Sequence, residues 1–445
     1  MRPTQLHDLA HLLELNPPYQ DLVHGIAIDS RKIVAGDLFF ALPGNRVDGH
    51  AFLKEAASKG AVCAIVQEGY RGDSGGLPLL FVRDVLTALQ ELARKSLASR
   101  SSRVIAISGS LGKTTTKEFT TALLRTRYRV FSNPLSYNSQ ATLPLSILMA
   151  EGDEEYLILE MGMTHEGNIK NLISIAPPDI ALITTIAVQH AVNFSDGLVG
   201  ISREKASLFS HSKTTLGLVH RDILHFDAVA STGGCTKKTF SLATREADYF
   251  LEAIPQGVRV HAKGEKPCDC FLTLPIKVHH HNFLAAVALA HHLDVPWSSI
   301  CGVAPTLKLP PMRFEPVEKQ GILFINDAYN ANPDAMIAAL ENLPKPQPGC
   351  KTIAVLSEMD ALGDYTEQGH ALVAETALQY ADYVLCLGSR CETMRAIWKS
   401  AQKPVELFQT RADLSAALKA LAHPGDVVLL KGARAYALDQ LLQDW

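Results

Sequence analysis

An excess of basic residues is missing from this sequence. Lysine and arginine number 42 against 46 aspartates and glutamates, which leaves a formal net charge of −4. Binding to a nucleic-acid backbone needs a positively charged face that neutralises phosphates. The short basic run Arg125, Arg127 and Arg129 is typical of the solvated end of a helix. We therefore expect no nucleic-acid partner.

Long apolar runs are also missing. No stretch approaches the roughly 18 uninterrupted apolar residues that a membrane-spanning helix needs. The segment from Met1 to Ala10 has no positively charged part followed by an apolar core, which a secretory signal would require. These absences predict no membrane span and a cytoplasmic location.

Cysteine is present but follows no recognisable metal or disulfide pattern. The eight cysteines are scattered, and the only close pair is Cys268 and Cys270. This pair has neither Cys-x-x-Cys spacing nor a second pair that would complete a zinc site. We expect reduced thiols with a structural role.

The length and composition predict several domains. The chain has 445 residues, which exceeds the size at which one hydrophobic core stops growing, and 47% of them are apolar. Regular structure should break at the polar run Ser99 to Arg103 and again at Leu309, Pro310 and Pro311. We expect three domains, at residues 1–98, 99–310 and 311–445.

Short apolar runs alternate with helix-length segments in the second and third parts. This alternation is typical of a parallel sheet covered by helices, so the predicted fold class is α/β. The predicted strands are Val104 to Ile107, Tyr156 to Leu159, Ile180 to Thr184, Leu323 to Ile325, Thr352 to Leu356, Tyr383 to Leu387 and Val427 to Leu430. The predicted helices include Asp334 to Leu343 and Glu367 to Tyr380.

A glycine loop follows the strand Val104 to Ile107 and precedes a helix-compatible run. It reads Ser108-Gly109-Ser110-Leu111-Gly112-Lys113-Thr114-Thr115-Thr116. In such a loop backbone N–H groups bind phosphate oxygens, the lysine reaches the outer phosphates and the first threonine can bind Mg²⁺. The strict Walker pattern needs glycine where Ile107 stands, so the loop is a shortened variant. Taken alone, it could also be a glycine turn with a purely structural purpose.

The shortened loop resembles that of the Mur ligases and the folylpolyglutamate synthases, which form amide bonds through acyl phosphates. Other motifs follow in the order of that family: Glu160-Met161-Gly162 with Gly167-Asn168-Ile169, then His190, then Lys205 in Arg203-Glu204-Lys205-Ala206. A lone glutamate, histidine or lysine is usually solvated or structural. Their common order at strand ends behind a phosphate loop favours a ligand site.

The most specific match lies in the third part, at Asn326-Asp327-Ala328-Tyr329-Asn330-Ala331-Asn332-Pro333-Asp334-Ala335-Met336. It resembles the Mur ligase branch that adds D-alanyl-D-alanine, and the Asp-Asn-Pro-Arg motif of the branch that adds the third amino acid is missing. An Asn/Asp/Pro cluster can also be a turn and a helix cap. Further agreement comes from Arg313, Val355 to Met359, Leu362-Gly363, His370 and Lys431 to Arg434.

The first part resembles the UDP-sugar-binding domain of the same family. The matching residues are Asp29-Ser30-Arg31, Gly36 to Ala41, and Gly44 through Asp48-Gly49-His50. The planar donor fork of Arg31 could hold an anionic group, although a plain surface arginine is an alternative.

The resemblance implies an ATP-dependent ligase that adds D-alanyl-D-alanine to UDP-N-acetylmuramoyl-tripeptide and so completes a peptidoglycan precursor. It implies ATP and Mg²⁺, a UDP-muramoyl-peptide-binding domain, a central ATP-binding domain and a C-terminal ligase domain in a monomer. The implied catalytic residues are Lys113, Glu160, His190 and Lys205, with Lys205 carbamylated. Mg²⁺ would bind to Thr114, Glu160, His190 and Lys205. The implied ATP-binding residues are Gly109, Ser110, Gly112, Lys113, Thr114, Thr115, Asn282, Arg313 and Asp327. The implied substrate-binding residues are Ser30, Arg31, Asp48, His50, Asn138, Tyr329, Asn330, Asn332 and Lys431.

The sequence also departs from the family pattern. Residues that differ from it are Ser136, Ser139, Thr142, Thr185, Ser207 and Val278. The triplet His279, His280 and His281 cannot all face one ion on a regular element, so it is interpreted as structural or near the adenine. Two alternatives stay open at this point, a folylpolyglutamate synthase and a nucleotide-binding protein without catalysis. The sequence does not decide between diaminopimelate and lysine as the third residue of the peptide.

Overall fold

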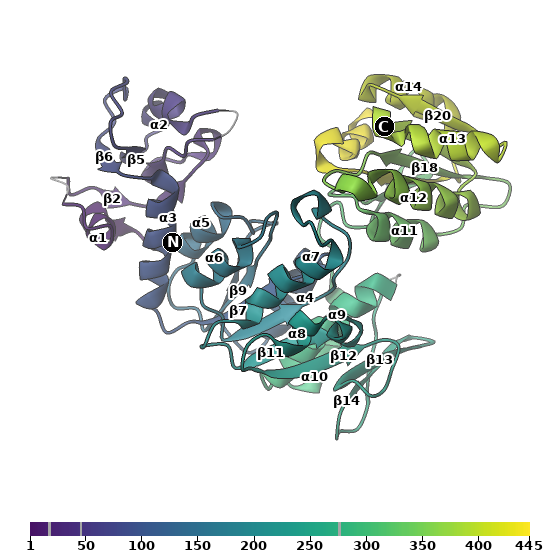
Figure 1. Cartoon of the computed structure of the whole chain (residues 1–445), viewed down its shortest axis with the longest axis horizontal. Helices are drawn as coiled ribbons and strands as arrows, with labels where there is room; N and C mark the ends of the chain where they lie inside the picture. Colours follow the sequence, from purple (N-terminus) through teal and green to yellow (C-terminus); the bar gives the residue numbers. More distant parts are fainter. Residues whose placement is uncertain (17–18, 45–46, 275–276) are drawn as a thin grey trace.

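The computed structural model describes residues 1–16, 19–44, 47–274 and 277–445, and it describes no side chain at residues 277 and 278. Val278, one of the departures from the family pattern, therefore lies outside the described side chains. The molecule consists of three α/β parts: the N-terminal part at the upper left of Figure 1, the central part below it, and the C-terminal part at the upper right. The predicted α/β fold class is confirmed.

The N-terminal part is built on a four-stranded parallel sheet. The order is β3 (Gly25–Ala27), β4 (Asp37–Phe40), β5 (Cys63–Gln67) and β6 (Leu79–Val82). A short antiparallel pair, β1 (Thr4–Gln5) and β2 (Leu22–Val23), lies beside helix α1 (Leu6–Leu12), and α2 (Leu53–Ser58) precedes β5. Helix α3 (Val85–Ala98) leads into the central part, and Asp84 caps its N-terminus by accepting from the N–H of Thr87.

The central part contains a nine-stranded sheet in the order β15-β14-β13-β12-β11-β10-β7-β9-β8. Its strands are β7 (Arg103–Ser108), β8 (Val130–Ser132), β9 (Tyr156–Glu160), β10 (Ile180–Ile183), β11 (Leu216–His220), β12 (Thr236–Ser241), β13 (Tyr249–Ile254), β14 (Gly257–Ala262) and β15 (Cys268–Cys270). Its helices are α4 (Lys113–Leu124), α5 (Thr142–Met149), α6 (Asn168–Ile175), α7 (Leu198–Ala206), α8 (Asp227–Ser231), α9 (Lys277–His292) and α10 (Trp297–Val303). The three predicted central strands are confirmed as β7, β9 and β10.

Strand β7 lies in the middle of this sheet and is buried on both faces. Val104 and Ala106 belong to one apolar core, whereas Ile105 and Ile107 belong to the core on the opposite face. Successive residues of a strand point to opposite faces, so a continuous apolar run suits a sheet covered on both sides. One feature was not predicted: β13 still pairs in parallel with β12, and β14 and β15 then extend the sheet by antiparallel pairing.

The C-terminal part contains a six-stranded sheet in the order β16-β17-β21-β18-β19-β20, parallel except for the edge strand β16. Its strands are β16 (Glu315–Lys319), β17 (Ile322–Asn326), β18 (Thr352–Ser357), β19 (Tyr383–Leu387), β20 (Val405–Phe408) and β21 (Val427–Lys431). Its helices are α11 (Pro333–Glu341), α12 (Thr366–Tyr380), α13 (Glu392–Ser400) and α14 (Arg411–Leu421). The four strands and two helices predicted here are confirmed. Within the described residues, no helix has the length and hydropathy that crossing a bilayer would require.

Candidate active site

The glycine loop joins the end of β7 to the start of α4. Gly109 has φ +146° and Gly112 has φ +77°, conformations that side-chain-bearing residues rarely adopt. A Cβ at Gly112 would also lie 2.1 Å from the Oδ1 atom of Asn282. Because Gly112 caps α4 without a side chain, the first N–H groups of the helix stay available to an anion.

Lys113, the first residue of α4, folds back over this loop. Its Nζ atom donates to the backbone oxygen of Gly109 at 2.8 Å and to that of Ser110 at 3.3 Å. Burial lowers the pKa of Lys113, Glu160 opposes that shift, and Arg313 adds to it. The ammonium therefore lies where a phosphate held by the loop would be.

Glu160 ends β9, the strand next to β7, and is 1% exposed. Its carboxylate accepts from the Thr114 hydroxyl at 2.8 Å and from the Asn138 amide at 2.6 Å. No lysine, arginine or histidine of the described chain forms an ion pair with it. A buried carboxylate without a cationic partner, beside a hydroxyl, is suited to a hard divalent cation.

Two residues that the sequence analysis missed hold Glu160 in place. The Asn133 side chain accepts from the Glu160 N–H at 2.8 Å and donates to the Glu160 backbone oxygen at 3.3 Å. Lys117, which is fully buried, donates to the backbone oxygens of Asn133 and Leu135. The sequence signal was weak, since it consists only of a lysine on the apolar side of a helix.

His190 and Lys205 approach the glycine loop from the segments after β10. Burial lowers the pKa of His190 to about 4, and the nearby Lys113 ammonium adds to this effect. Burial and Lys113 lower the pKa of Lys205 well below its ordinary value. Lys205 is 2% exposed, and no hydrogen-bond or ion-pair partner of its Nζ atom occurs within the described part of the chain. Neighbouring Glu204 instead accepts from the N–H groups of Gly167 and Ile169.

The C-terminal part contributes a second group of residues. Lys431, 2% exposed, donates to the Asp327 carboxylate at 2.5 Å and to the backbone oxygen of Asn330 at 3.2 Å. The Arg313 guanidinium lies 4.0 Å from the ring centroid of Tyr329, and its Nη2 atom is 3.4 Å from the Thr114 hydroxyl. Arg313 thus reaches from the linker after α10 into the central part.

These groups line one cavity of about 360 Å³ between the central and C-terminal parts. The predicted site residues that line it are Ser110, Gly112, Lys113, Thr114, Thr115, Asn138, Glu160, His190, Lys205, Asn282, Arg313, Asp327, Tyr329, Asn330, Asn332 and Lys431. Asn168, from the motif Gly167-Asn168-Ile169, also lines it, and residues that line it without having been predicted include Gln140, Thr164 and Gln189. Gly109 belongs to the loop but is not among the lining residues.

Four predicted substrate residues of the N-terminal part lie apart from this cavity and have local partners. Ser30 donates to Glu55 at 2.8 Å. The Arg31 side chain is 82% exposed and forms a two-point ion pair with Asp29. Asp48 accepts from both the N–H and the ring Nδ1 of His50, and the His50 Nε2 accepts from the N–H of Gln67. The ring of His50 also stacks on Tyr70.

Some motif residues also serve local structure. The Asn332 side chain accepts from the N–H of Ala335 and caps α11, as the alternative interpretation of that cluster proposed. Buried His370 accepts from the N–H of Met359 and donates to the backbone oxygen of Thr366.

The departures from the family pattern make short-range contacts of their own. The Ser136 hydroxyl lies 2.9 Å from that of Thr114, and the Thr185 hydroxyl accepts from the N–H of Leu111 in the glycine loop. Ser139 and Thr142 bond to each other, and Ser207 donates to the backbone oxygen of Arg203. Ser136 and Ser139 therefore line the cavity and Thr185 contacts the loop, whereas Ser207 does neither.

His279 lies at the cavity with neither ring nitrogen hydrogen-bonded to a described residue. It is 4% exposed, and burial lowers its pKa to about 3, with His280 and Arg313 adding to the effect. The unfolded chain binds a proton at an ordinary histidine pKa of about 6.5, whereas the folded chain does not. His279 thus makes the fold less stable as the pH falls from about 6.5 towards 3.

We expect the substitution His279→Gln to weaken this pH dependence. Between pH 6.5 and 4.5 the free energy of unfolding of the variant should fall less steeply than that of wild type, by up to about 1.4 kcal/mol per pH unit. Urea unfolding followed by circular dichroism at several pH values measures the slope. The exposed His7, replaced by Gln, is the control and should leave the slope unchanged. Equal slopes in wild type and His279→Gln would contradict the depressed pKa.

The chain matches sequence patterns of the Mur ligase family in three segments. "Mur ligase family, catalytic domain" matches residues 22–96, "Mur ligase middle domain" matches residues 107–290, and "Mur ligase, glutamate ligase domain" matches residues 312–434. A curated relative from Bacillus subtilis, named UDP-N-acetylmuramoyl-tripeptide--D-alanyl-D-alanine ligase, is 31% identical over 96% of this chain and 94% of its own length.

Solved structures of similar proteins cover the same range. A crystal structure of MurF from Acinetobacter baumannii is 25% identical with a TM-score of 0.82, and the match covers 100% of this chain and 99% of that one. A structure of MurF from Thermotoga maritima in complex with ADP is 27% identical with a TM-score of 0.76, over 94% of this chain and 96% of that one.

Proposed function

The chain belongs to the Mur ligase family, and on that premise we propose that it joins D-alanyl-D-alanine to UDP-N-acetylmuramoyl-tripeptide at the expense of ATP. The supporting observation is a single cavity that brings together a phosphate loop, a buried carboxylate and cationic groups from two parts of the chain. The product, a UDP-linked pentapeptide, is a peptidoglycan precursor, and nucleotide-linked substrates favour a cytoplasmic location. We also propose that the protein acts as a monomer.

We propose that the three parts divide the work at residues 1–98, 99–310 and 311–445. The first would bind the UDP-muramoyl peptide through Ser30, Arg31, Asp48 and His50. The second would bind ATP, and the third would complete the nucleotide and dipeptide sites. Arg31 is the exposed member of the first set, so its fork could exchange the Asp29 carboxylate for an anionic substrate group.

A carboxylate does not react with an amine at neutral pH, so its oxygen must first become a leaving group. Transfer of the γ-phosphoryl group of ATP to the tripeptide carboxylate supplies that acyl phosphate, and the amine of D-alanyl-D-alanine then displaces phosphate. Both the carboxylate and the phosphate are anionic, so positioning and charge neutralisation should dominate catalysis. In this proposal Lys113 exchanges the backbone oxygens of the loop for phosphate oxygens.

The residues around Glu160 fit Mg²⁺ by their chemistry. Thr114 and Glu160 present hard oxygen donors 2.8 Å apart, and the carboxylate has no cationic partner of its own in the described chain. We propose that these two residues hold one ion and that His190 and a carbamylated Lys205 hold a second. When bound, Mg²⁺ would offset phosphate charge. His190 is suited to its role because its low pKa keeps the imidazole neutral.

The C-terminal residues would hold the nucleotide in the closed enzyme. The Asp327 carboxylate accepts from Lys431 and from the N–H of Phe314, so it fixes the linker that carries Arg313. Arg313 stacks on Tyr329 and points to Thr114, at the entrance of the phosphate loop. We propose that closure of the third part brings these charges to the phosphates and excludes water.

ATP cleavage should require the UDP-tripeptide, because its carboxylate is the first nucleophile. We expect a UDP-linked pentapeptide in the mass spectrum when UDP-tripeptide, D-alanyl-D-alanine and ATP are present together. Comparing the diaminopimelate and lysine tripeptides identifies the third residue. Turnover of folate with glutamate instead would favour the folylpolyglutamate synthase alternative. Absence of phosphate release in a single turnover would favour a binding protein without catalysis.

A further inference from the structure

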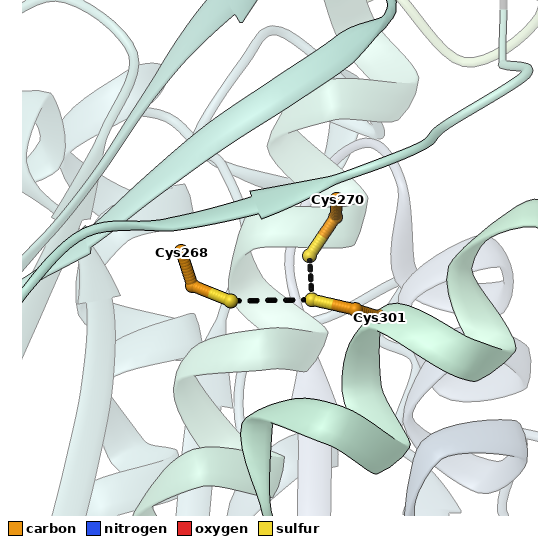
Figure 2. Close-up of side chains that lie close together, drawn as sticks. All are labelled: Cys268, Cys270 and Cys301. Atoms are coloured by element: carbon orange, nitrogen blue, oxygen red, sulfur yellow. Dashed lines mark hydrogen bonds between the residues drawn. The ribbon is translucent and has the colours of Figure 1, made fainter.

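Three cysteine thiols lie together on the outer side of the central part, away from the cavity. Cys268 and Cys270 come from the edge strand β15, and Cys301 comes from helix α10 (Figure 2). The Sγ atom of Cys301 lies 2.7 Å from that of Cys270 and 3.3 Å from that of Cys268. All three sulfurs fall within 4.8 Å of one another. We call these residues the thiol cluster.

The fold explains why the three side chains meet. Residues 268 and 270 are two apart on one strand, so their side chains leave the same face of the sheet. Helix α10 packs against that face and supplies Cys301 between them. Cys270 is buried, while Cys268 and Cys301 are part-exposed and can be reached by solvent.

We propose that the thiol cluster is a binding site for one soft divalent cation of the zinc type. Zinc is bound in proteins by cysteine thiolates, commonly with four ligands in a tetrahedral arrangement. A disulfide would use only two of the sulfurs, whereas a cation uses all three. On binding, each thiol gives its proton to solvent and becomes a thiolate. No histidine, aspartate or glutamate of the described chain joins the cluster, so water is the fourth ligand.

The sulfur spacing is compatible with uptake of such an ion after a small outward movement. Bonds of about 2.3 Å in a tetrahedral arrangement separate the sulfurs by about 3.8 Å. The present separations of 2.7 and 3.3 Å are shorter. Uptake of a cation therefore requires the sulfurs to move apart by about 0.5 and 1.1 Å. An edge strand and a seven-residue helix can both accommodate that shift.

The site would connect the antiparallel edge of the central sheet to its helical layer. Helix α10 also contacts α4, the helix that starts at the phosphate loop. None of the three cysteines lines the cavity. Metal binding at the thiol cluster is therefore separable from ligation, and failure of either proposal leaves the other standing.

Titration of the reduced full-length protein with Co²⁺ under anaerobic conditions tests the proposal. We expect a sulfur-to-cobalt charge-transfer band that saturates at one ion per chain and is abolished by Zn²⁺. Oxygen and nitrogen ligands at the ATP cavity cannot give this band. Cys301→Ser and Cys268→Ser should each weaken binding by at least about a hundredfold. Cys235→Ser, which alters a part-exposed thiol of the same domain outside the cluster, should leave binding unchanged.

Several results would overturn this assignment. One is the absence of the band in the wild type, and another is its persistence in Cys301→Ser. Equal loss in Cys235→Ser would show that the band is not specific to the cluster. A disulfide between Cys270 and Cys301 without cation uptake by the reduced protein would assign a redox role instead. Circular dichroism confirms folding of each variant, and Cys268→Ser decides the test if Cys301→Ser does not fold.

Discussion

We expect Lys113→Ala to abolish ligation while the fold stays intact. Among the described residues, the Lys113 ammonium donates hydrogen bonds only to backbone oxygens of its own loop, so its loss removes no core packing. Its proposed partners are the β- and γ-phosphates of ATP. Neutralising their negative charge matters most while the phosphoryl group is being transferred. Removing one such charge-stabilising group costs about 100- to 1000-fold in kcat, and more when the group also positions ATP. Steady-state phosphate release and the yield of UDP-pentapeptide measure the loss.

The control for this substitution is Lys237→Ala. Lys237 lies in the same domain on β12, donates to the backbone oxygen of Thr232 and does not line the cavity. We expect wild-type turnover for this variant and matching circular dichroism spectra for both. Turnover of Lys113→Ala within about tenfold of wild type would remove the loop from the mechanism, because about 1.4 kcal/mol is too little for this role.

The glycine loop was predictable because its determinants are local in sequence. A buried strand, two glycines with positive φ and a helix that begins at Lys113 occupy consecutive positions. Glu160 followed from the same logic, since the ends of parallel strands meet at one edge of a sheet. Local pattern and global fold agree at these residues, which is where sequence-based reasoning is strongest.

Other features depend on contacts between distant residues. Lys117 is fully buried against the backbone oxygens of residues 133 and 135. The sequence pattern of its helix does not indicate those partners. Strand β15 has three residues at the sheet edge, and β14 buries only every second residue, so their apolar signal is weak. The thiol cluster needs Cys301, which stands far from Cys270 in the chain. Spacing in the sequence therefore did not connect the cysteine pair with Cys301.

In the N-terminal part, the sequence pattern does not separate structural residues from ligand-binding ones. The pattern around Asp48 and His50 marks a turn whose two side chains bond to each other and to β5. A sequence pattern cannot separate a residue retained for that turn from one that binds a ligand. Exposed Arg31 has no comparable structural role beyond its ion pair with Asp29. Its substitution should therefore change the affinity for substrate more than the free energy of unfolding.

Lys205→Ala should collapse ligation, and the reason lies in the surroundings of this lysine. Burial and the Lys113 ammonium lower its pKa well below the ordinary value, which favours the neutral amine. A neutral amine can add CO₂ to form a carbamate and release one proton. An unmodified ammonium beside Mg²⁺ would instead face a cation in a partly desolvated site, which is unfavourable. We therefore expect a loss of at least about 100-fold in kcat. Phosphate release measures this loss.

Short carboxylic acids should partly restore the activity of Lys205→Ala, because acetate or propionate can occupy the place of the carbamate. The same acids should not rescue Lys113→Ala, whose missing group is a cation, and this comparison separates site-specific rescue from a general effect of salt. In the wild type, labelled bicarbonate should give a carbamate signal in the carbon-13 spectrum that is absent from Lys205→Ala. If the wild type gives no carbamate signal and the acids rescue nothing, Lys205 would be reassigned as a direct phosphate contact. Ser207 is the reason for this alternative. Its hydroxyl donates to the Arg203 backbone oxygen, and it adds no negative charge near Lys205 where the family pattern has a glutamate.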